Sequence, residues 1–167
     1  IDKRAEEIIV EQIQTTYPTH NILAEESGTT QVDKSNEYTW IVDPIDGTLN
    51  FIRGIPHFAV SIGIQKGNHL EHGVIVDPIN REEYVASRGY GATLNGKKIR
   101  VSSSEFLQDG LVSAGIAPSN INQRLESYIK NLQEFTRACQ AIRSTGSAAL
   151  DLAYVASGKF DGFWHPS

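Results

Sequence analysis

Two aspartates on either side of a Pro-Ile pair could together bind a cation. Asp43 ends a short apolar run, and Pro44 fixes φ and favours a turn directly after it. This turn lets the carboxylates of Asp43 and Asp46 converge, with the carbonyl oxygen of Ile45 exposed between them. Glu25 follows a second short apolar run and could complete the ligand shell. A donor set made only of oxygen suits a hard cation such as Mg²⁺.

The two residues after this acidic segment could handle a phosphate group. Gly47 allows close backbone approach, and the amides of Gly47 and Thr48 could receive phosphate oxygens. The Thr48 hydroxyl could also orient a water molecule. Two metal ions sharing the carboxylates would stabilise the attacking and the leaving oxygen of an in-line displacement. Residues 43–48 therefore predict metal-dependent hydrolysis of a phosphate ester.

A plain turn is the alternative interpretation of the same residues. Asp, Pro and Gly are common in turns, where an Asp side chain caps backbone amides and binds no metal. Asp77-Pro78 illustrates such a turn, because no second acid and no Gly-Thr pair follows it. Taken alone, residues 43–48 leave both interpretations open.

The elements that must position these residues alternate between helical and strand-like patterns. Apolar spacing predicts a helix over about residues 2–16 and a strand at 22–24, whereas residues 29–37 are expected to be irregular. Further strands are expected at 39–42, ending on Asp43, and at 58–64, 70–76 and 83–86, with turns at 77–80 and 95–96. Two later helices are expected, around 125–135 and at 148–156. The mixture predicts an α/β (α+β) layered fold.

Composition and charge exclude several function classes. The chain has 167 residues, 40% of them apolar, which suits one globular domain. A net charge of −5 without long runs of either sign argues against nucleic-acid binding and against a membrane contact. Cys139 is the only cysteine, so an intrachain disulfide and a cysteine zinc site are excluded. The expected location is cytoplasmic.

A long set of motifs carries a resemblance to a known family. The segment Glu25-Glu26-Ser27, followed by the run from Trp40 to Phe51, resembles the signature of the inositol monophosphatase family. The similarity continues through residues 59–63, 89–92 and 143–149, and the bacterial inositol-1-phosphatase type is the most similar branch. The resemblance implies a layered α/β sandwich of the inositol monophosphatase/fructose-1,6-bisphosphatase (sugar phosphatase) type.

The same resemblance implies a role for each matching residue. The implied Mg²⁺ ligands are Glu25, Asp43, the Ile45 carbonyl and Asp46. The implied catalytic residues are Thr48, which helps to activate water, Asp2, an acid paired with that threonine, and Glu26, an acid near the metals. The implied substrate-binding residues are Ile45, Asp46, Gly47 and Thr48 around the phosphate, Gly146, Ser147 and Ala148 at the inositol ring, and His165 where the family often has a glutamate.

The implied activity is hydrolysis of myo-inositol 1-phosphate to myo-inositol and phosphate, with two or three Mg²⁺ ions in a homodimer. Fructose 1,6-bisphosphate and 3′-phosphonucleotides are alternative substrates, since related enzymes with this core use them. A non-catalytic role beside the transcription machinery is a further alternative. A haloacid-dehalogenase phosphatase is excluded, because it needs Asp-x-Asp spacing, and neither a Gly-x-Ser-x-Gly elbow nor a P-loop occurs.

The chain also departs from the family pattern at both ends. The family has a Trp-Asp pair a short distance after the segment matching Phe163-Trp164, and it has a helix and a metal-site lysine before Asp2. Neither is present. We therefore expect residues 1–167 to be a single partial phosphatase domain that lacks its N-terminal helix and C-terminal portion. Such a fragment is expected to have little activity by itself, because the leaving oxygen also needs stabilisation.

Overall fold

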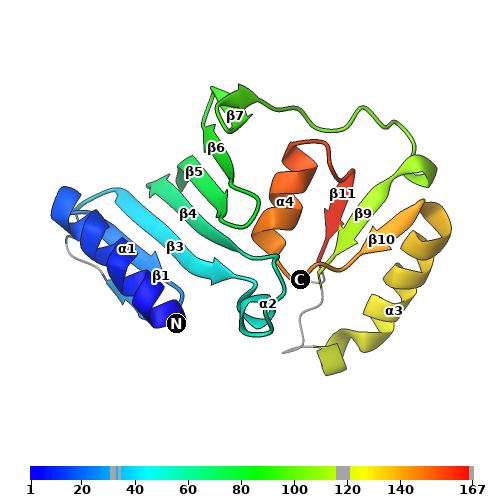
Figure 1. Ribbon diagram of the computed structural model, residues 1–167, viewed down its shortest axis with the longest axis horizontal. Helices are drawn as coiled ribbons and strands as arrows, with labels where there is room; N and C mark the ends of the chain where they lie inside the picture. Colours follow the sequence, from blue (N-terminus) through cyan, green and yellow to red (C-terminus); the bar gives the residue numbers. More distant parts are fainter. Residues whose placement is uncertain (31–32, 34, 116–120, 166–167) are drawn as a thin grey trace. The chain divides into compact units, whose positions relative to one another are not determined.

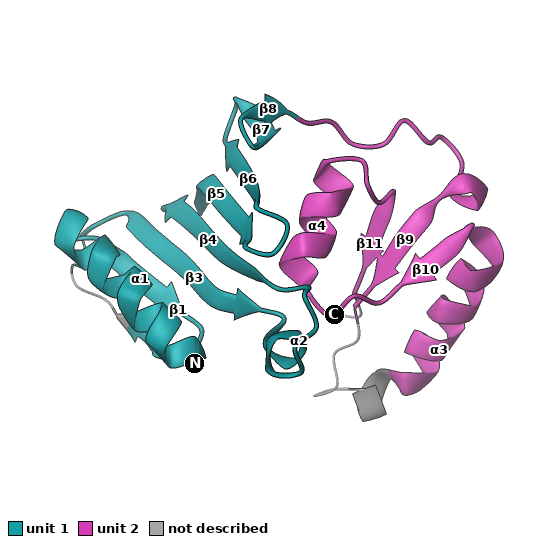
Figure 2. Cartoon of the chain, in the orientation of Figure 1, with its two compact units in different colours: residues 1–98 teal, residues 99–167 magenta. Residues whose placement is uncertain are grey.

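The chain folds as two compact units. The computed structural model describes residues 1–30, 33, 35–115 and 121–165. Unit 1 comprises Ile1–Lys98 and unit 2 comprises Ile99–Ser167 (Figure 2). That the chain is one partial phosphatase domain stays a prediction.

Unit 1 is built on an eight-stranded sheet (Figure 1). The strand order is β2-β1-β3-β4-β5-β6-β7-β8, and only the β1–β3 pair is parallel. The strands are β1 (Asn21–Ala24), β2 (Gly28–Thr30), β3 (Tyr38–Asp46), β4 (Ala59–Lys66), β5 (His69–Asp77), β6 (Glu82–Ser87), β7 (Gly91–Leu94) and β8 (Lys97–Lys98). Residues 28–30 pair with β1, so the prediction that 29–37 is irregular is wrong at its start, and residues 31–32 and 34 lie outside the described part.

The first helix of unit 1 covers one face of this sheet. Helix α1 (Asp2–Thr16) matches the predicted helix and lies along β1 and β3 in Figure 1. Its Ile13 is buried in a cluster with Ile22, Ala24 and Val42. Burial of each large aliphatic side chain contributes about 1.5–3 kcal/mol. The cluster therefore holds α1 against the two parallel strands that lead into the acidic residues.

Strand β3 runs further than the sequence predicts. It passes through Pro44 and ends at Asp46, whereas we expected the strand to end on Asp43 with a turn directly after it. The pairing with β4 shifts between Asp43, which faces Ser61, and Asp46, which faces Ala59. One extra residue on β3 is a bulge, and a bulge tolerates a proline that cannot donate a ladder hydrogen bond. The predicted turn is therefore wrong, although the backbone is irregular where it was expected.

Two predicted turns are confirmed in unit 1. Asn95 and Gly96 both have positive φ, 48° and 76°, and join β7 to β8 as a tight hairpin. Asp77 accepts backbone N–H bonds of 2.9 Å from Ile79 and from Asn80. This carboxylate caps a turn, as the sequence indicated.

Unit 2 contains a separate parallel sheet. Its order is β10-β9-β11, from β9 (Leu111–Ala114), β10 (Ala141–Arg143) and β11 (Gly162–Trp164). The helices are α3 (Ile121–Ala138) and α4 (Ala148–Ala156), both predicted, and the short 3₁₀ helix η1 (Leu107–Asp109). Trp164 packs between Tyr128 and Phe135, with ring centroids 5.0 and 5.6 Å away. Among the described residues, no helix has the length and apolarity needed to cross a membrane.

Candidate active site

Asp43 and Glu25 lie beside each other because the strands that carry them are parallel. Ala24, the last residue of β1, is in register with Val42 of β3. The next residues, Glu25 and Asp43, therefore emerge at the same edge of the sheet. The Glu25 backbone N–H continues the pairing by donating to the Val42 carbonyl at 3.1 Å.

The pKa of Asp43 reflects burial and the negative charges of two neighbouring acids. Its pKa is raised from 3.8 to about 7, first by burial, then by a side-chain hydrogen bond with Glu25 and by the negative charges of Glu25 and Asp46. A hydrogen bond from the Ile45 N–H, 3.1 Å long, acts in the opposite direction. A carboxylate in such surroundings gains stability from a bound cation or a shared proton.

Ile45 is held on both sides by its neighbours. Its N–H donates to Oδ1 of Asp43, and its carbonyl oxygen accepts a 3.0 Å hydrogen bond from Oγ1 of Thr48. The Ile45 side chain is buried. Hydrogen bonds with Asp43 and Thr48 therefore stabilise the bulge of β3 on both sides of Ile45.

Gly47 lets the chain pass from the bulge into a short helix. It has φ 93° and ψ 34°, a left-handed conformation that costs other residues about 1–2 kcal/mol. Helix α2 (Thr48–Ile52) starts directly after it and was not predicted. Asn50 is buried, and its side-chain amide donates to the His57 carbonyl at 2.8 Å, which ties α2 to the approach to β4.

The remaining predicted residues of unit 1 are Asp2 and Glu26. Asp2 is the first residue of α1, and no hydrogen bond joins it to Thr48 in the described part of the chain. Glu26 follows Glu25 in the loop between β1 and β2, and its backbone N–H donates to the Glu6 carboxylate at 2.8 Å. The predicted roles of Asp2 and Glu26 stay predictions.

The other predicted residues belong to unit 2. Gly146 has φ 88°, and Ser147 caps α4 by accepting the Leu150 N–H at 3.4 Å, one residue before Ala148. His165 follows β11, is exposed, and has its ring 6.3 Å from that of Phe163. Their contact with a substrate stays a prediction.

A buried carboxylate that the sequence did not single out organises the start of α4. Asp151 is 2% exposed and accepts hydrogen bonds from Oγ of Ser113 at 2.6 Å and from Oγ1 of Thr145 at 2.7 Å. The Ser113–Asp151 contact joins β9 to α4, and the Thr145 contact fixes the segment that precedes Gly146. An acid in the first helical turn is ordinary in a sequence, so no local signal distinguished it.

The donors at the end of β1 and β3 fit a hard divalent cation. Glu25, Asp43, Asp46 and the Ile45 carbonyl offer oxygen only, which is what Mg²⁺ prefers. Within the described residues, however, no three acidic, histidine or cysteine side chains converge into a complete ligand group. The fit therefore rests on the hydrogen bond between the Asp43 and Glu25 side chains together with the adjacent Ile45 carbonyl.

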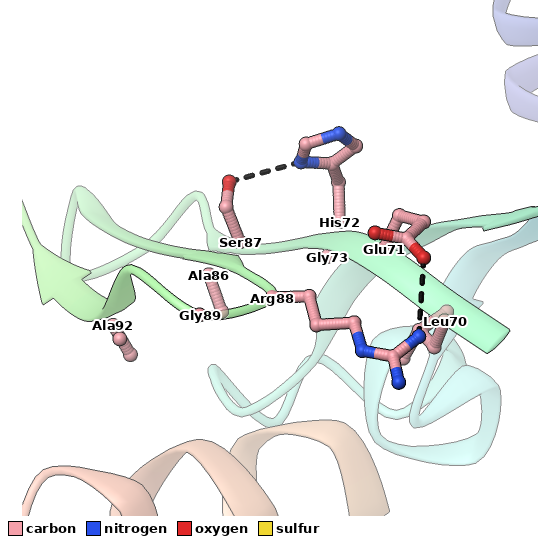
Figure 3. Close-up of a pocket in the computed structure, with 10 residues that line it drawn as sticks. Leu70, Glu71, His72, Gly73, Ala86, Ser87, Arg88, Gly89 and Ala92 are labelled. Atoms are coloured by element: carbon pink, nitrogen blue, oxygen red, sulfur yellow. Dashed lines mark hydrogen bonds and ion pairs between the residues drawn. The ribbon is translucent and has the colours of Figure 1, made fainter.

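Unit 1 also has a hollow that contains none of the proposed cation ligands (Figure 3). Its volume is about 400 Å³, and residues of β5, β6 and β7 line it. Two polar pairs border it, His72 Nδ1 with Ser87 Oγ at 2.9 Å and Arg88 with Glu71 at 3.2 Å. His72 and Ser87 are register partners on adjacent strands, and the floor consists of small residues such as Gly73 and Ala86. None of the predicted site residues lines this hollow.

Comparison with known proteins decides the family. The profile of the inositol monophosphatase family matches residues 1–167. The chain belongs to the inositol monophosphatase family. Curated relatives include the "Nus factor SuhB" of Pseudomonas aeruginosa, 44% identical over 167 residues, and that of Escherichia coli K12, 43% identical over 164 residues. Each comparison covers 98% of this chain and 61% of the relative. The chain thus spans about three fifths of the length of these two relatives.

Solved structures confirm the family fold. The SuhB extragenic suppressor protein of Bartonella henselae has a TM-score of 0.93 and 40% identity, and it aligns over 99% of this chain and 63% of its own. The inositol monophosphatase of Anabaena has a TM-score of 0.92 and 39% identity, over 99% of this chain and 65% of its own. The predicted layered α/β sandwich of the inositol monophosphatase family is therefore confirmed.

Proposed function

We propose that the protein containing this chain is a Mg²⁺-dependent phosphomonoester hydrolase that converts myo-inositol 1-phosphate and water into myo-inositol and phosphate. One observation carries the proposal: the parallel register of β1 and β3 brings the Glu25 side chain within hydrogen-bonding reach of Asp43, beside the Ile45 carbonyl. Thr48 is tied to the carbonyl between the two aspartates. Family membership supports the same conclusion.

The residues that would hold Mg²⁺ are Glu25, Asp43, Asp46 and the Ile45 carbonyl. When bound, the ions supply charge neutralisation on the phosphate and a lowered pKa of water, and family resemblance implies two or three of them. The Thr48 hydroxyl donates to Ile45, so its oxygen lone pairs remain to accept a hydrogen bond from the attacking water and orient it. Glu26 and Asp2 would act as further acids near this water.

Substrate contacts complete the proposal. The amides of Gly47 and Thr48 would receive phosphate oxygens, and Gly146, Ser147 and Ala148 would contact the inositol hydroxyls. His165 would contact the ring from the position where relatives often have a glutamate. The homodimer and the cytoplasmic location implied by the resemblance belong to this proposal as well.

A matched set of variants tests the proposed site in the intact gene product. Phosphate release from myo-inositol 1-phosphate is measured with Mg²⁺ for the wild type, Asp46→Asn and the control Asp109→Asn. Asp109 is exposed on η1 and is not one of the proposed ligands or substrate contacts, so its variant makes the same chemical change at a residue outside the proposed set. We expect Asp46→Asn to lose at least about a hundredfold in kcat/KM, consistent with loss of charge stabilisation at the reacting phosphate. Equal rates for all three proteins would exclude the site.

Substrate identity is decided by the same assay. Fructose 1,6-bisphosphate and a 3′-phosphonucleotide are compared with myo-inositol 1-phosphate under identical conditions. The proposed substrate should give the highest kcat/KM, because discrimination reflects differential binding of the transition state. A higher value for either competitor would move the assignment to that substrate.

A non-catalytic role in transcription is the second candidate. The curated relatives of Pseudomonas aeruginosa and Escherichia coli carry the name Nus factor, which favours it. The net charge of −5 disfavours direct nucleic-acid binding, so a protein partner is the form of this role that fits the chain. No phosphate release from any substrate, together with binding of the intact gene product to purified bacterial RNA polymerase, would establish this role over the enzymatic one.

A further inference from the structure

Glu6 of α1 is a buried acid that the proposed chemistry does not use. Its side chain is only 4% exposed. The two carboxylate oxygens accept from consecutive backbone amides, Oε2 from Glu26 N–H at 2.8 Å and Oε1 from Ser27 N–H at 3.0 Å. Both bonds are short and charge-assisted, a class about twice as strong as neutral hydrogen bonds. Both carboxylate oxygens of Glu6 therefore bind the backbone of the loop between β1 and β2.

The loop that Glu6 binds also contains Glu25, a proposed ligand of Mg²⁺. On one side of Glu25 its own N–H is bonded to the Val42 carbonyl of β3. On the other side, the next two amides are bonded to Glu6. The chain then reverses at Gly28, which has φ 76°. Gly28 begins β2 and pairs with Ala24 of β1. Without Glu6, two amides of this tight reversal would lose their protein acceptor.

A merely structural acceptor would not need to be charged. A carboxylate adds negative charge close to a loop that already holds Glu25 and Glu26, so its use here has an electrostatic cost. Its advantage is two equivalent oxygens, one for each of the adjacent amides, whereas a glutamine would place an N–H donor opposite one of the two N–H groups. Glu6, Glu26 and Ser27 also line a small hollow of about 220 Å³, so the contact lies next to open space at the loop.

We propose that Glu6 is a positioning residue, whose carboxylate fixes the Glu26–Ser27 backbone and thereby holds the Glu25 carboxyl against Asp43. This inference rests on the proposed function for its consequence, since the held geometry matters for cation binding. It predicts that losing one of the two bonds lets the loop move and weakens Mg²⁺ binding. Partners that orient metal ligands in this way typically contribute 10–100-fold in affinity, roughly.

The neighbouring acid supplies a matched control. The Glu7 side chain is 64% exposed and pairs with Arg4 at 3.1 Å. It borders the same hollow, but within the described part of the chain it makes no hydrogen bond to the loop. Glu6→Gln and Glu7→Gln remove the same charge from adjacent positions of α1. Glu6→Asp keeps the charge but shortens the side chain, so that it cannot reach both amides. A purely electrostatic effect would appear in both glutamine variants and not in Glu6→Asp.

Two measurements on the intact gene product test the inference. Hydrogen exchange of the peptide containing residues 25–28 should accelerate in Glu6→Gln and Glu6→Asp and stay as in the wild type in Glu7→Gln. Calorimetric titration with Mg²⁺ should give a dissociation constant about tenfold higher for the two Glu6 variants only. Unchanged exchange or an unchanged constant in both Glu6 variants would overturn the inference, and so would complete loss of folding, which would assign Glu6 to the fold alone.

The outcome is separable from that of the proposed function. If the wild type neither binds Mg²⁺ nor releases phosphate, the proposed function fails, whatever the Glu6 variants do. If the wild type does both and the Glu6 variants match it, only the positioning role fails. Faster exchange in the Glu6 variants without any Mg²⁺ binding by the wild type would limit Glu6 to holding the loop and would overturn its link to a cation.

Discussion

The Thr48 hydroxyl donates a 3.0 Å hydrogen bond to the carbonyl oxygen of Ile45. The single proton of the hydroxyl is used in this bond, so toward any other group Thr48 can only accept. The carbonyl oxygen has a second lone pair, which leaves it able to contact a cation as well. Two groups singled out from the sequence for different tasks are therefore directly joined, and Thr48 is oriented as a hydrogen-bond acceptor toward any other group.

The first prediction concerns this hydroxyl. Thr48→Val keeps the shape but removes the oxygen, and we expect kcat to fall about a hundredfold or more, because the attacking water loses a group that orients it. Thr48→Ser keeps the oxygen and should stay within about tenfold of the wild type. Phosphate release from myo-inositol 1-phosphate by the intact gene product is the measurement. Full activity in Thr48→Val would remove Thr48 from the proposed mechanism.

The second prediction concerns the left-handed glycine before α2. Gly47→Ala should destabilise the fold by about 1–2 kcal/mol, because φ is 93° at this position. Gly73 is the control, since its φ is not positive and a Cβ added there would have no heavy atom within 4 Å. Gly73→Ala should leave stability unchanged or raise it by about 0.5–1 kcal/mol. Urea unfolding measures both, and equal effects would refute the assigned strain.

The third prediction concerns the buried acid of unit 2. Asp151→Ala should lower the free energy of unfolding by about 1–3 kcal/mol, because the hydroxyls of Ser113 and Thr145 lose their acceptor. A double-mutant cycle with Ser113→Ala should give a coupling of about 0.5–3 kcal/mol between the two residues. Additive effects would show that the 2.6 Å contact is energetically silent.

The fourth prediction concerns the pH dependence of stability. The pKa of Asp161 is lowered from 3.8, mainly by a hydrogen bond with the Ser102 side chain and then by the backbone N–H of Leu111, whose bond is 2.7 Å long. A carboxyl whose pKa is lower in the folded state stabilises the fold above its ordinary pKa, and this contribution is lost as the pH falls through the folded value.

Asp161→Asn should therefore reduce stability at about pH 6 but not at about pH 2. Denaturant unfolding of both proteins over this range is the test, and the difference between them should shrink below about pH 4. The group is exposed, so the effect should be small. A difference that is constant with pH would attribute the variant's effect to hydrogen-bond geometry rather than to the carboxylate charge.

The fifth prediction separates the repulsion within the acidic cluster from the proposed binding of Mg²⁺ by it. Asp43→Asn removes one member of the like-charged group with Glu25 and Asp46. In EDTA we expect its Tm to rise, by about 2–4 °C for each kcal/mol of repulsion removed in a chain of this size. Mg²⁺ should raise the Tm of the wild type and of Asp109→Asn, but not that of Asp43→Asn. An equal Mg²⁺ effect on all three would place the cation elsewhere.

Sequence patterns alone identified much of the fold. Helices α1 and α4 match their predicted ranges because each has apolar residues at helical spacing and a clear end signal. Strands β9, β10 and β11 were not predicted, since segments of three or four residues show little periodicity, and β1, equally short, was expected only from its apolar run. The bulge at Pro44 was expected as a turn, because a lone proline indicates irregular backbone but not whether pairing resumes beyond it.

The sequence by itself determined which side chains could bind a cation or a phosphate. It also determined the family of the chain, because residue identity and spacing are local properties. Tertiary structure decided which of them meet. The parallel register of β1 and β3 brings Glu25 to Asp43, and packing of α1 brings Glu6 to the loop. Glu6 and Glu7 are adjacent and chemically identical, yet one is 4% and the other 64% exposed. Burial on a helix depends on what packs against each face, and that is settled only when distant segments come together.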